Sequence, residues 1–161
     1  MRVICDDICE RKRGRLLGLD IGDKTIGISV SDDLQMVASS VTIINRTSLK
    51  RDLSALDEQI KMLRPIAIVY GWPLQMDGTP GSQCEKVQAF IDAIEPIYAD
   101  IPLIEWDERF STKVTNSVLL EADMSRKRRK DIIDKMAATY ILQGALDRIT
   151  NLRRTRDAQP Y

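Results

Sequence analysis

Apolar and polar positions alternate through residues 15–33, which read RLLGLDIGDKTIGISVSDD. This alternation predicts two strands joined by a tight turn, because successive side chains of a strand point to opposite faces. The first strand has Leu17, Leu19 and Ile21 on one face, and Gly18, Asp20 and Gly22 on the other. The glycines leave room for a bulky group to approach the backbone beside Asp20. The Asp20 carboxylate must then be solvated, paired or bound to a cation, unless it simply caps the turn.

Strand and helix patterns follow in turn along the rest of the chain. Residues 37–44 continue the alternation as a third strand, and apolar residues at helical spacing run from a cap at Thr47 or Ser48 to Pro65. We next expect a buried strand at 66–70, a loop at 71–81 and a helix opened by a capping box at Ser82 and Glu85. A strand at 101–106 and a helix from Ser111 or Thr112 to about Glu121 follow. A mobile basic link then leads to a last helix at about 129–149. This order predicts an α/β fold whose mixed central sheet has three antiparallel strands, then parallel ones, flanked by helices.

Composition indicates one globular domain. Of 161 residues, 43% are hydrophobic and 30% are charged, which is enough to bury a single core. We expect an N-terminal extension at 1–14, a main domain at 15–150 and a flexible tail at 151–161. No apolar run approaches the roughly 18 residues of a membrane span, and the first residues show no signal-peptide pattern. We therefore expect a cytoplasmic protein that does not bind membranes.

Two residue types narrow the possible chemistry. The three cysteines are odd in number and form no C-x-x-C pair, which argues against a disulfide framework and a structural zinc site. The sequence contains no histidine, which excludes Ser-His-Asp triads, Cys-His pairs and histidine-bound zinc. An enzyme of this composition must use carboxylates, lysine, a hydroxyl group or a metal held by oxygen.

Three acidic residues occupy positions typical of catalytic groups. Asp20 lies on the first strand, and Glu108 follows the last apolar strand, where ligands gather in α/β sheets. Asp134 lies on the last helix above the small residues Ala137 and Ala138, so we expect it to point toward the packed side. Alternatively, the Asp134 carboxylate only stabilises the helix through its interaction with the positive helix N-terminus, which is worth about 0.3–1 kcal/mol. If all three converge, their repulsion requires a cation, and hard divalent ions such as Mg²⁺ take oxygen ligands.

Other positions are candidates for binding phosphate. They are Lys24, Gly71, Gly78, Thr79, Arg109, Arg126, Lys127, Arg128, Arg129 and Lys130. The glycine-rich loop precedes a helix whose N–H groups can receive an anion, and the basic run can bind phosphate although the formal net charge is zero. Both the loop and the basic run also have a non-functional interpretation. A basic run is usually solvated surface charge, and the loop lacks a P-loop pattern, so it can be a plain surface loop. Trp72 either stacks on a base or anchors the core.

Four motifs, in this order, resemble the YqgF/RuvX-type resolvase family. They are GLDIG at 18–22 with IGISVSD at 26–32, GWPLQMDGT at 71–79, DERFST at 107–112 and DKMAA at 134–138. The resemblance implies a ribonuclease H-like fold and a nuclease, described either as a processor of the 5′ end of pre-16S rRNA or as a Holliday junction resolvase. It also implies that Asp20, Glu108 and Asp134 are the catalytic acids. Trp72 and Phe110 stand where we expect smaller or aliphatic residues, which leaves the shape of the substrate groove open.

The favoured hypothesis is a nuclease in which Asp20, Glu108 and Asp134 hold one or two Mg²⁺ or Mn²⁺ ions. Its expected partners are structured RNA or branched DNA and ribosomal precursor particles, and both a monomer and a homodimer remain open. One alternative is a non-catalytic RNA-binding assembly factor, although clustered acids gain nothing for pure phosphate binding. Another is an actin-like phosphotransferase, which also uses an Asp-x-Gly hairpin but needs a second related half, and 161 residues are too few for it.

Overall fold

The structure is a computed structural model that describes residues 2–3, 8–11, 13–108 and 125–159. Its elements are β1 (Arg2–Val3), β2 (Leu16–Ile21), β3 (Thr25–Ser31), β4 (Ala38–Asn45), α2 (Leu49–Leu63), β5 (Ala67–Trp72), α3 (Ser82–Ile94), β6 (Leu103–Asp107) and α5 (Arg126–Asp157). The described strands form one six-stranded sheet in the order β1-β6-β5-β2-β3-β4. Strands β2, β3 and β4 pair antiparallel, whereas β5 is parallel to both β2 and β6. The predicted mixed α/β sheet is confirmed.

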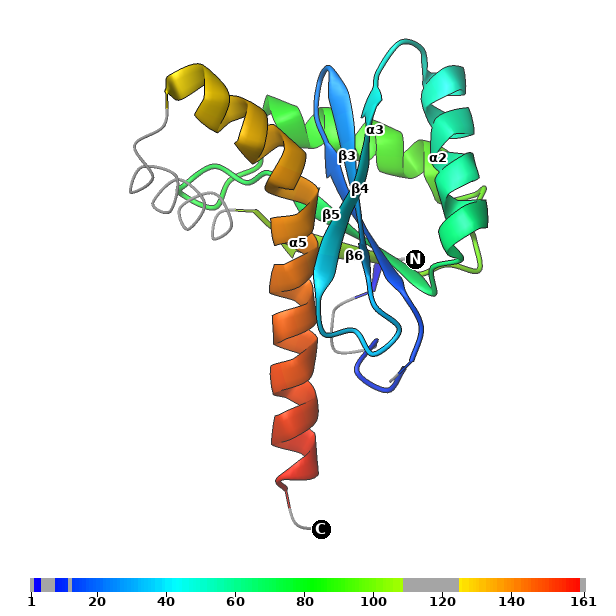
Figure 1. Cartoon of the computed structure of the whole chain (residues 1–161), viewed down its shortest axis with the longest axis vertical. Helices are drawn as coiled ribbons and strands as arrows, with labels where there is room; N and C mark the ends of the chain where they lie inside the picture. The colour runs from blue at the N-terminus through cyan, green and yellow to red at the C-terminus, as the bar shows by residue number, and fades with distance from the viewer. Residues whose placement is uncertain (1, 4–7, 12, 109–124, 160–161) are drawn as a thin grey trace.

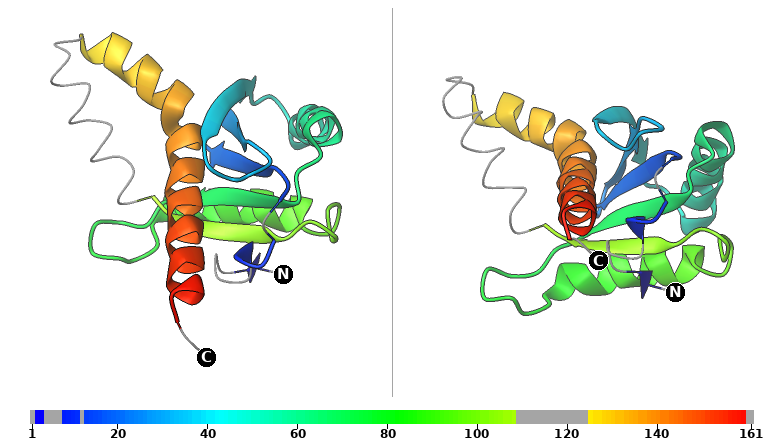
Figure 2. Two further views of the ribbon diagram at one scale, coloured as in Figure 1. Left: turned by 60° about the horizontal axis from the view of Figure 1, so that its bottom comes forward. Right: turned by 90° about the horizontal axis from the view of Figure 1, so that it is seen from below.

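Helices cover both faces of this sheet (Figures 1 and 2). The apolar face of β2 packs with residues of α2 and α3 in one core, which includes Leu19, Leu56 and Phe90. A second core on the other face joins the sheet to α5 through Ile141 and Leu142. The two faces expected from the alternation along β2 are therefore confirmed. No helix within the described ranges is both long and apolar enough to cross a membrane.

The parallel strands run further than the sequence pattern predicts. Strand β5 includes Gly71 and Trp72, which we placed in a loop, because these residues pair with Trp106 and Asp107 of β6. The ladder holds them extended although their sequence is rich in turn-forming residues. Strands β5 and β6 consequently end together, one residue before Glu108.

Two predicted helix starts have different outcomes. The Ser48 side chain caps α2 and accepts a hydrogen bond from Arg51 N at 3.3 Å, as the pattern predicts. The capping box predicted at Ser82 is wrong, because Gly81 is the N-cap of α3 and makes no side-chain cap bond, so Ser82 is already helical. The helix predicted at 111–121 lies outside the described residues.

Helix α5 is longer at both ends than the predicted helix at 129–149. Residues 126–128, which we placed in a mobile basic link before this helix, form its first turn, because the Ser125 side chain caps the helix and accepts from Arg128 N at 3.4 Å. Its far end continues to Asp157, into the segment where we expected a frayed tail. Leu152 packs against the second core there, which holds this end in place.

The N-terminal extension, expected to have little structure, joins the sheet and the core. Strand β1 pairs in parallel with β6, and Ile8 and Cys9 are buried on the α5 side. The Arg153 guanidinium donates to the Cys9 carbonyl at 3.0 Å and to the Arg11 carbonyl at 2.8 Å. The end of α5 therefore anchors this segment, a contact between positions more than 140 residues apart.

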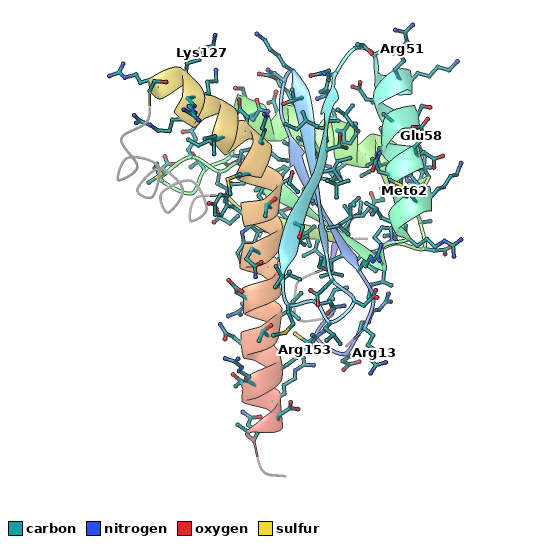
Figure 3. The ribbon with its side chains drawn as sticks, viewed as in Figure 1. Arg13, Arg51, Glu58, Met62, Lys127 and Arg153 are labelled. Atoms are coloured by element: carbon teal, nitrogen blue, oxygen red, sulfur yellow. The ribbon has the colours of Figure 1, made fainter. Side chains whose placement is uncertain are left out.

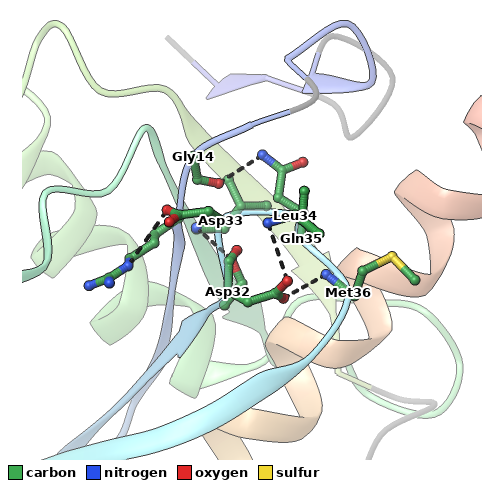
Figure 4. A network of polar contacts seen from close by, with 9 residues as sticks. Gly14, Asp32, Asp33, Leu34, Gln35 and Met36 are labelled. Atoms are coloured by element: carbon green, nitrogen blue, oxygen red, sulfur yellow. Dashed lines mark hydrogen bonds and ion pairs between the residues drawn. The ribbon is translucent and has the colours of Figure 1, made fainter.

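The turn between β3 and β4 belongs to the same network (Figure 4). The Asp32 carboxylate accepts from the backbone N–H groups of Val37 and Met36, each at 2.8 Å, and these bonds lower the pKa of Asp32. Buried Gln35 donates to the Gly14 carbonyl at 2.9 Å and accepts from Arg153 at 2.6 Å. One polar network thus joins this turn, the entry to β2 and the end of α5.

Candidate active site

Asp20 lies near the carboxyl end of β2, on the same face of the strand as Gly18, which α5 covers. Its neighbour Gly18 makes this close approach possible, because a Cβ at Gly18 would lie 2.9 Å from the Ala138 carbonyl oxygen and 2.8 Å from Leu142 Cβ. Buried Ser29 on β3 donates to the same Ala138 carbonyl at 2.7 Å. The bulky group that Gly18 admits beside Asp20 is therefore helix α5, whereas Gly22 faces the turn, where a Cβ would lie 3.0 Å from the Thr25 carbonyl oxygen.

Gly27 continues this contact toward the start of α5. A Cβ at Gly27 would lie 3.3 Å from Ala138 Cβ, 3.6 Å from Asp20 Cβ and 3.9 Å from the Asp134 carbonyl oxygen. The backbone of α5 at Asp134 thus passes close to the strand that pairs with Asp20. Small residues on both the sheet and the helix set this separation.

Glu108 follows β6, and its N–H extends the strand pairing by donating to the Trp72 carbonyl at 3.2 Å. Its carboxylate occupies the space where Gly71 has no side chain: a Cβ there would overlap Oε1 and lie 2.7 Å from the carboxyl carbon. Gly71 is one of the candidates for contact with a nucleic acid. In the structure it makes room for the Glu108 carboxylate.

The three acids form a chain of interacting charges. Burial raises the pKa of Asp20 to about 6, with a further rise from the charge of Asp134. Burial also raises the pKa of Glu108 to about 7, and the charges of Asp20 and Asp107 add to this rise. The charge of Asp134 therefore acts on Asp20, and the charge of Asp20 acts on Glu108. Asp107 is a fourth acid at this edge, which the sequence analysis did not single out although it adjoins Glu108.

The Asp134 side chain is exposed, whereas we expected it to point toward the packed side of α5. The backbone of α5 at Asp134 passes close to β3 at Gly27, so the exposure belongs to the side chain and not to a separation of the helix from the sheet. The charge of Asp134 still acts on Asp20.

The carboxylates suit a hard divalent cation by donor type, since Mg²⁺ and Mn²⁺ prefer oxygen ligands. A cation beside Asp20 and Glu108 would also favour their charged forms and offset the raised pKa values. Within the described residues, no three acidic or cysteine side chains are arranged to hold a metal ion as they stand. The structure thus brings the acids together in pairs and does not close them around one point.

The loop after Trp72 is folded on itself. Leu74 and Pro80 form an isolated bridge, and Gly78, with φ +87°, donates its N–H to the Gln75 carbonyl at 2.8 Å. The Thr79 N–H donates to the Asp77 carboxylate at 2.9 Å. The amides of Gly78 and Thr79, which we predicted to bind phosphate, therefore already have acceptors within the loop.

The basic candidates lie on different parts of the surface. Lys24 is exposed in the turn between β2 and β3. In the first turns of α5, four of the five basic side chains are exposed and Arg129 is half-buried, and Lys127 lies near the outer tip of the helix (Figure 3). Arg109 lies outside the described residues.

Comparison with known proteins gives a consistent family match. A family model described as RuvX: Holliday junction resolvase matches residues 14–148. A protein of Phenylobacterium zucineum named "Putative pre-16S rRNA nuclease" is 49% identical over 138 residues, 85% of this chain and 88% of that protein. Proteins of the same name from Clostridium kluyveri and Paracoccus denitrificans are 49% and 45% identical, over 84% and 89% of this chain and 98% and 90% of their own lengths.

Two solved structures share the fold at low sequence identity. The Thermus thermophilus RuvC complex with a Holliday junction substrate has a TM-score of 0.55 and 14% identity, covering 86% of this chain and 97% of its own. The yeast mitochondrial Holliday junction resolvase has a TM-score of 0.55 and 12% identity, covering 95% of this chain and 87% of its own. The predicted ribonuclease H-like fold is thereby confirmed.

Proposed function

The chain belongs to the RuvX family of Holliday junction resolvases, and from this premise we propose that it is a metal-dependent nuclease that processes the 5′ end of pre-16S rRNA. The name shared by relatives that match 84–89% of the chain supports this substrate. The nuclease activity agrees with a site of carboxylates and no histidine, because phosphodiester hydrolysis with metal ions needs only oxygen ligands.

The proposal is supported most by two close approaches beside Asp20 on β2. On the neighbouring strand β3, Gly27 lies against both Asp20 and the backbone of α5 at Asp134, and on the other neighbour, β5, Gly71 leaves the space that the Glu108 carboxylate fills. Burial and mutual repulsion raise the pKa of Asp20 and of Glu108, so the free protein holds these charges at a cost. Such a site gains stability when it binds cations. Asp20, Glu108 and Asp134 would hold one or two Mg²⁺ or Mn²⁺ ions, which would activate water and stabilise the leaving oxygen.

The remaining candidates would hold the substrate backbone. The basic first turns of α5 carry exposed charge close in sequence to Asp134, and the positive end of the helix adds to their attraction for phosphate. We include Lys24, Arg109 and residues 126–130 in this role. Phosphate contacts of this kind position a substrate without reading its sequence.

A Holliday junction is the second candidate substrate, because the matching family model is described as a resolvase. A cleavage assay with Mg²⁺ decides between the two. The chain is incubated with an RNA that spans the 5′ end of 16S rRNA and with a four-way DNA junction of equal length. Faster cleavage of the RNA supports rRNA processing, and faster symmetrical cleavage of the junction supports the alternative. RNA binding without cleavage of either substrate, across Mg²⁺ and Mn²⁺ titrations, contradicts the nuclease proposal.

The assignment of the acids is tested with Asp20→Asn and a matched control. Asp23→Asn removes a carboxylate only three residues away, which is exposed and pairs with Lys86 at 2.6 Å. We expect Asp20→Asn to lower the cleavage rate by about 10²-fold or more, as loss of a charge-stabilising group does, and Asp23→Asn to leave it nearly unchanged. Equal rates for the two variants would reject the site.

A further inference from the structure

A pocket of about 550 Å³ opens between the end of β5 and the start of α3. Its wall includes the side chains of Trp72, Gln75, Ser82, Glu85 and Gln88. The volume is within the range of pockets that bind small molecules. Neither the family match nor the arrangement of the acids accounts for it.

The pocket adjoins the acidic site but lies on the other side of the sheet. Gly71 faces α5 and leaves room for the Glu108 carboxylate, whereas the next residue, Trp72, packs on the core that α2 and α3 cover. This follows from the alternation of side chains along β5. The Trp72 carbonyl accepts a hydrogen bond from Glu108 N, so a residue of the pocket is bonded directly to the backbone of a candidate catalytic acid.

The side chains that line the pocket indicate which kind of ligand it can bind. Trp72 is half-buried and provides an aromatic surface, on which a nucleobase can stack. Exposed Glu85 lies in the first turn of α3 and repels a phosphate from that helix end, but its carboxylate can accept from the amino group of a base. A neutral, flat group with hydrogen-bond donors suits this wall better than an anion does.

We propose that this pocket binds an unpaired nucleobase of the RNA substrate, next to the phosphodiester held at the acids. The inference rests on the proposed nuclease function and adds a substrate preference to it. The RNA strand would cross the carboxyl edge of the sheet, with the scissile phosphate on the α5 side and the base on the α3 side. Bases that carry an amino group, such as cytosine, are preferred over uracil through Glu85. Fully paired RNA cannot supply the base.

The fluorescence of Trp72 provides a direct test, because the chain has only two tryptophans. Trp106→Phe leaves Trp72 as the single reporter, and Asp20→Asn in the same chain prevents cleavage. We expect a single-stranded cytosine octamer of RNA to quench this fluorescence and a blunt duplex RNA to leave it unchanged. Absence of quenching by the octamer, or equal quenching by the duplex, would overturn the proposal.

Affinity measurements test the roles of the two wall residues. Loss of base stacking in Trp72→Leu should weaken binding of the octamer about 5- to 150-fold, whereas Trp72→Phe keeps an aromatic ring and should retain most of it. Glu85→Gln should remove the preference for the cytosine octamer over a uracil octamer. The matched control is Glu58→Gln, which removes an exposed carboxylate on the outer side of α2 (Figure 3). Equal affinity of the unchanged chain for the two octamers would contradict the role of Glu85.

Cleavage by the unchanged chain is measured separately, so that the two proposals can fail independently. Cleavage with no quenching of Trp72 rejects the base pocket and leaves the nuclease function standing. Quenching with no cleavage of any RNA or junction rejects the nuclease function and leaves the base pocket standing.

Discussion

Replacement of Asp20 by Asn should stabilise the free protein at alkaline pH while it removes activity. A rise of the Asp20 pKa from 3.8 to about 6 means that the folded state binds its proton more tightly than the unfolded state does. The free energy of unfolding therefore falls as the pH rises from about 4 through 6, and the charged form costs about 3 kcal/mol above that range. Asn has a similar shape and does not titrate. At pH 8 the variant should exceed the original chain in stability by about 3 kcal/mol.

This difference is measured by urea unfolding at pH 8 and pH 5 with a chelator present. The advantage of Asp20→Asn should shrink to about half at pH 5, where much of Asp20 is protonated in the folded state but not in the unfolded one. Asp23→Asn serves as the control and should show no such dependence, because Asp23 is exposed. A variant that is less stable than the original chain at both pH values would refute the reasoning, as would a difference that does not change with pH.

Three further predictions concern residues that position the site. Gly71→Ala should lower the cleavage rate strongly and the stability of the fold only slightly, because the new Cβ overlaps the flexible carboxylate of Glu108 and displaces it. Cleavage and thermal unfolding are measured on the same preparation. Gly18→Ala should cost about 1–3 kcal/mol in urea unfolding, because the Cβ meets the backbone of α5, which cannot move aside; an unchanged midpoint would contradict the close packing. Arg153→Leu should expose the peptide bonds after Arg11 and Arg13 to trypsin and cost about 1–3 kcal/mol, because the Cys9 and Arg11 carbonyls lose their donor. Arg154→Leu, on an exposed neighbour, should leave trypsin cleavage after Arg11 and Arg13 unchanged.

The central part of the fold could be predicted because local pattern and tertiary contacts agree there. In β2 and β3, side chains alternate between the two faces of the sheet, and each face packs in a different core. The Ser48 cap and the end of α2 before Pro65 follow from backbone chemistry within a few residues. Asp20 could be singled out for the same reason, since the glycines beside it required a close neighbour.

The parts that sequence patterns missed depend on contacts between distant segments. Residues 2–3 are held by pairing with β6 and residues 9–11 by hydrogen bonds from Arg153, and the local sequence of the extension signals neither contact. Gly71 reads as a turn residue, but its role is to admit a side chain 37 positions later. Asp134 was expected to be inward because helical spacing places a residue on a face of the helix, but spacing does not tell how much of its side chain the neighbouring strand covers. The same limit applies to the pocket beside Trp72, whose wall combines a strand end with the first turns of α3.

Crystals of the chain soaked with Mn²⁺ would test the central claim, that Asp20, Glu108 and Asp134 act on one cation site, most directly. We expect anomalous density within about 2–2.5 Å of oxygens from Asp20 and Glu108, with Asp134 bound directly or through water, and loss of this density in Asp20→Asn. Density only at other positions, at Mn²⁺ concentrations that support RNA cleavage, would contradict it.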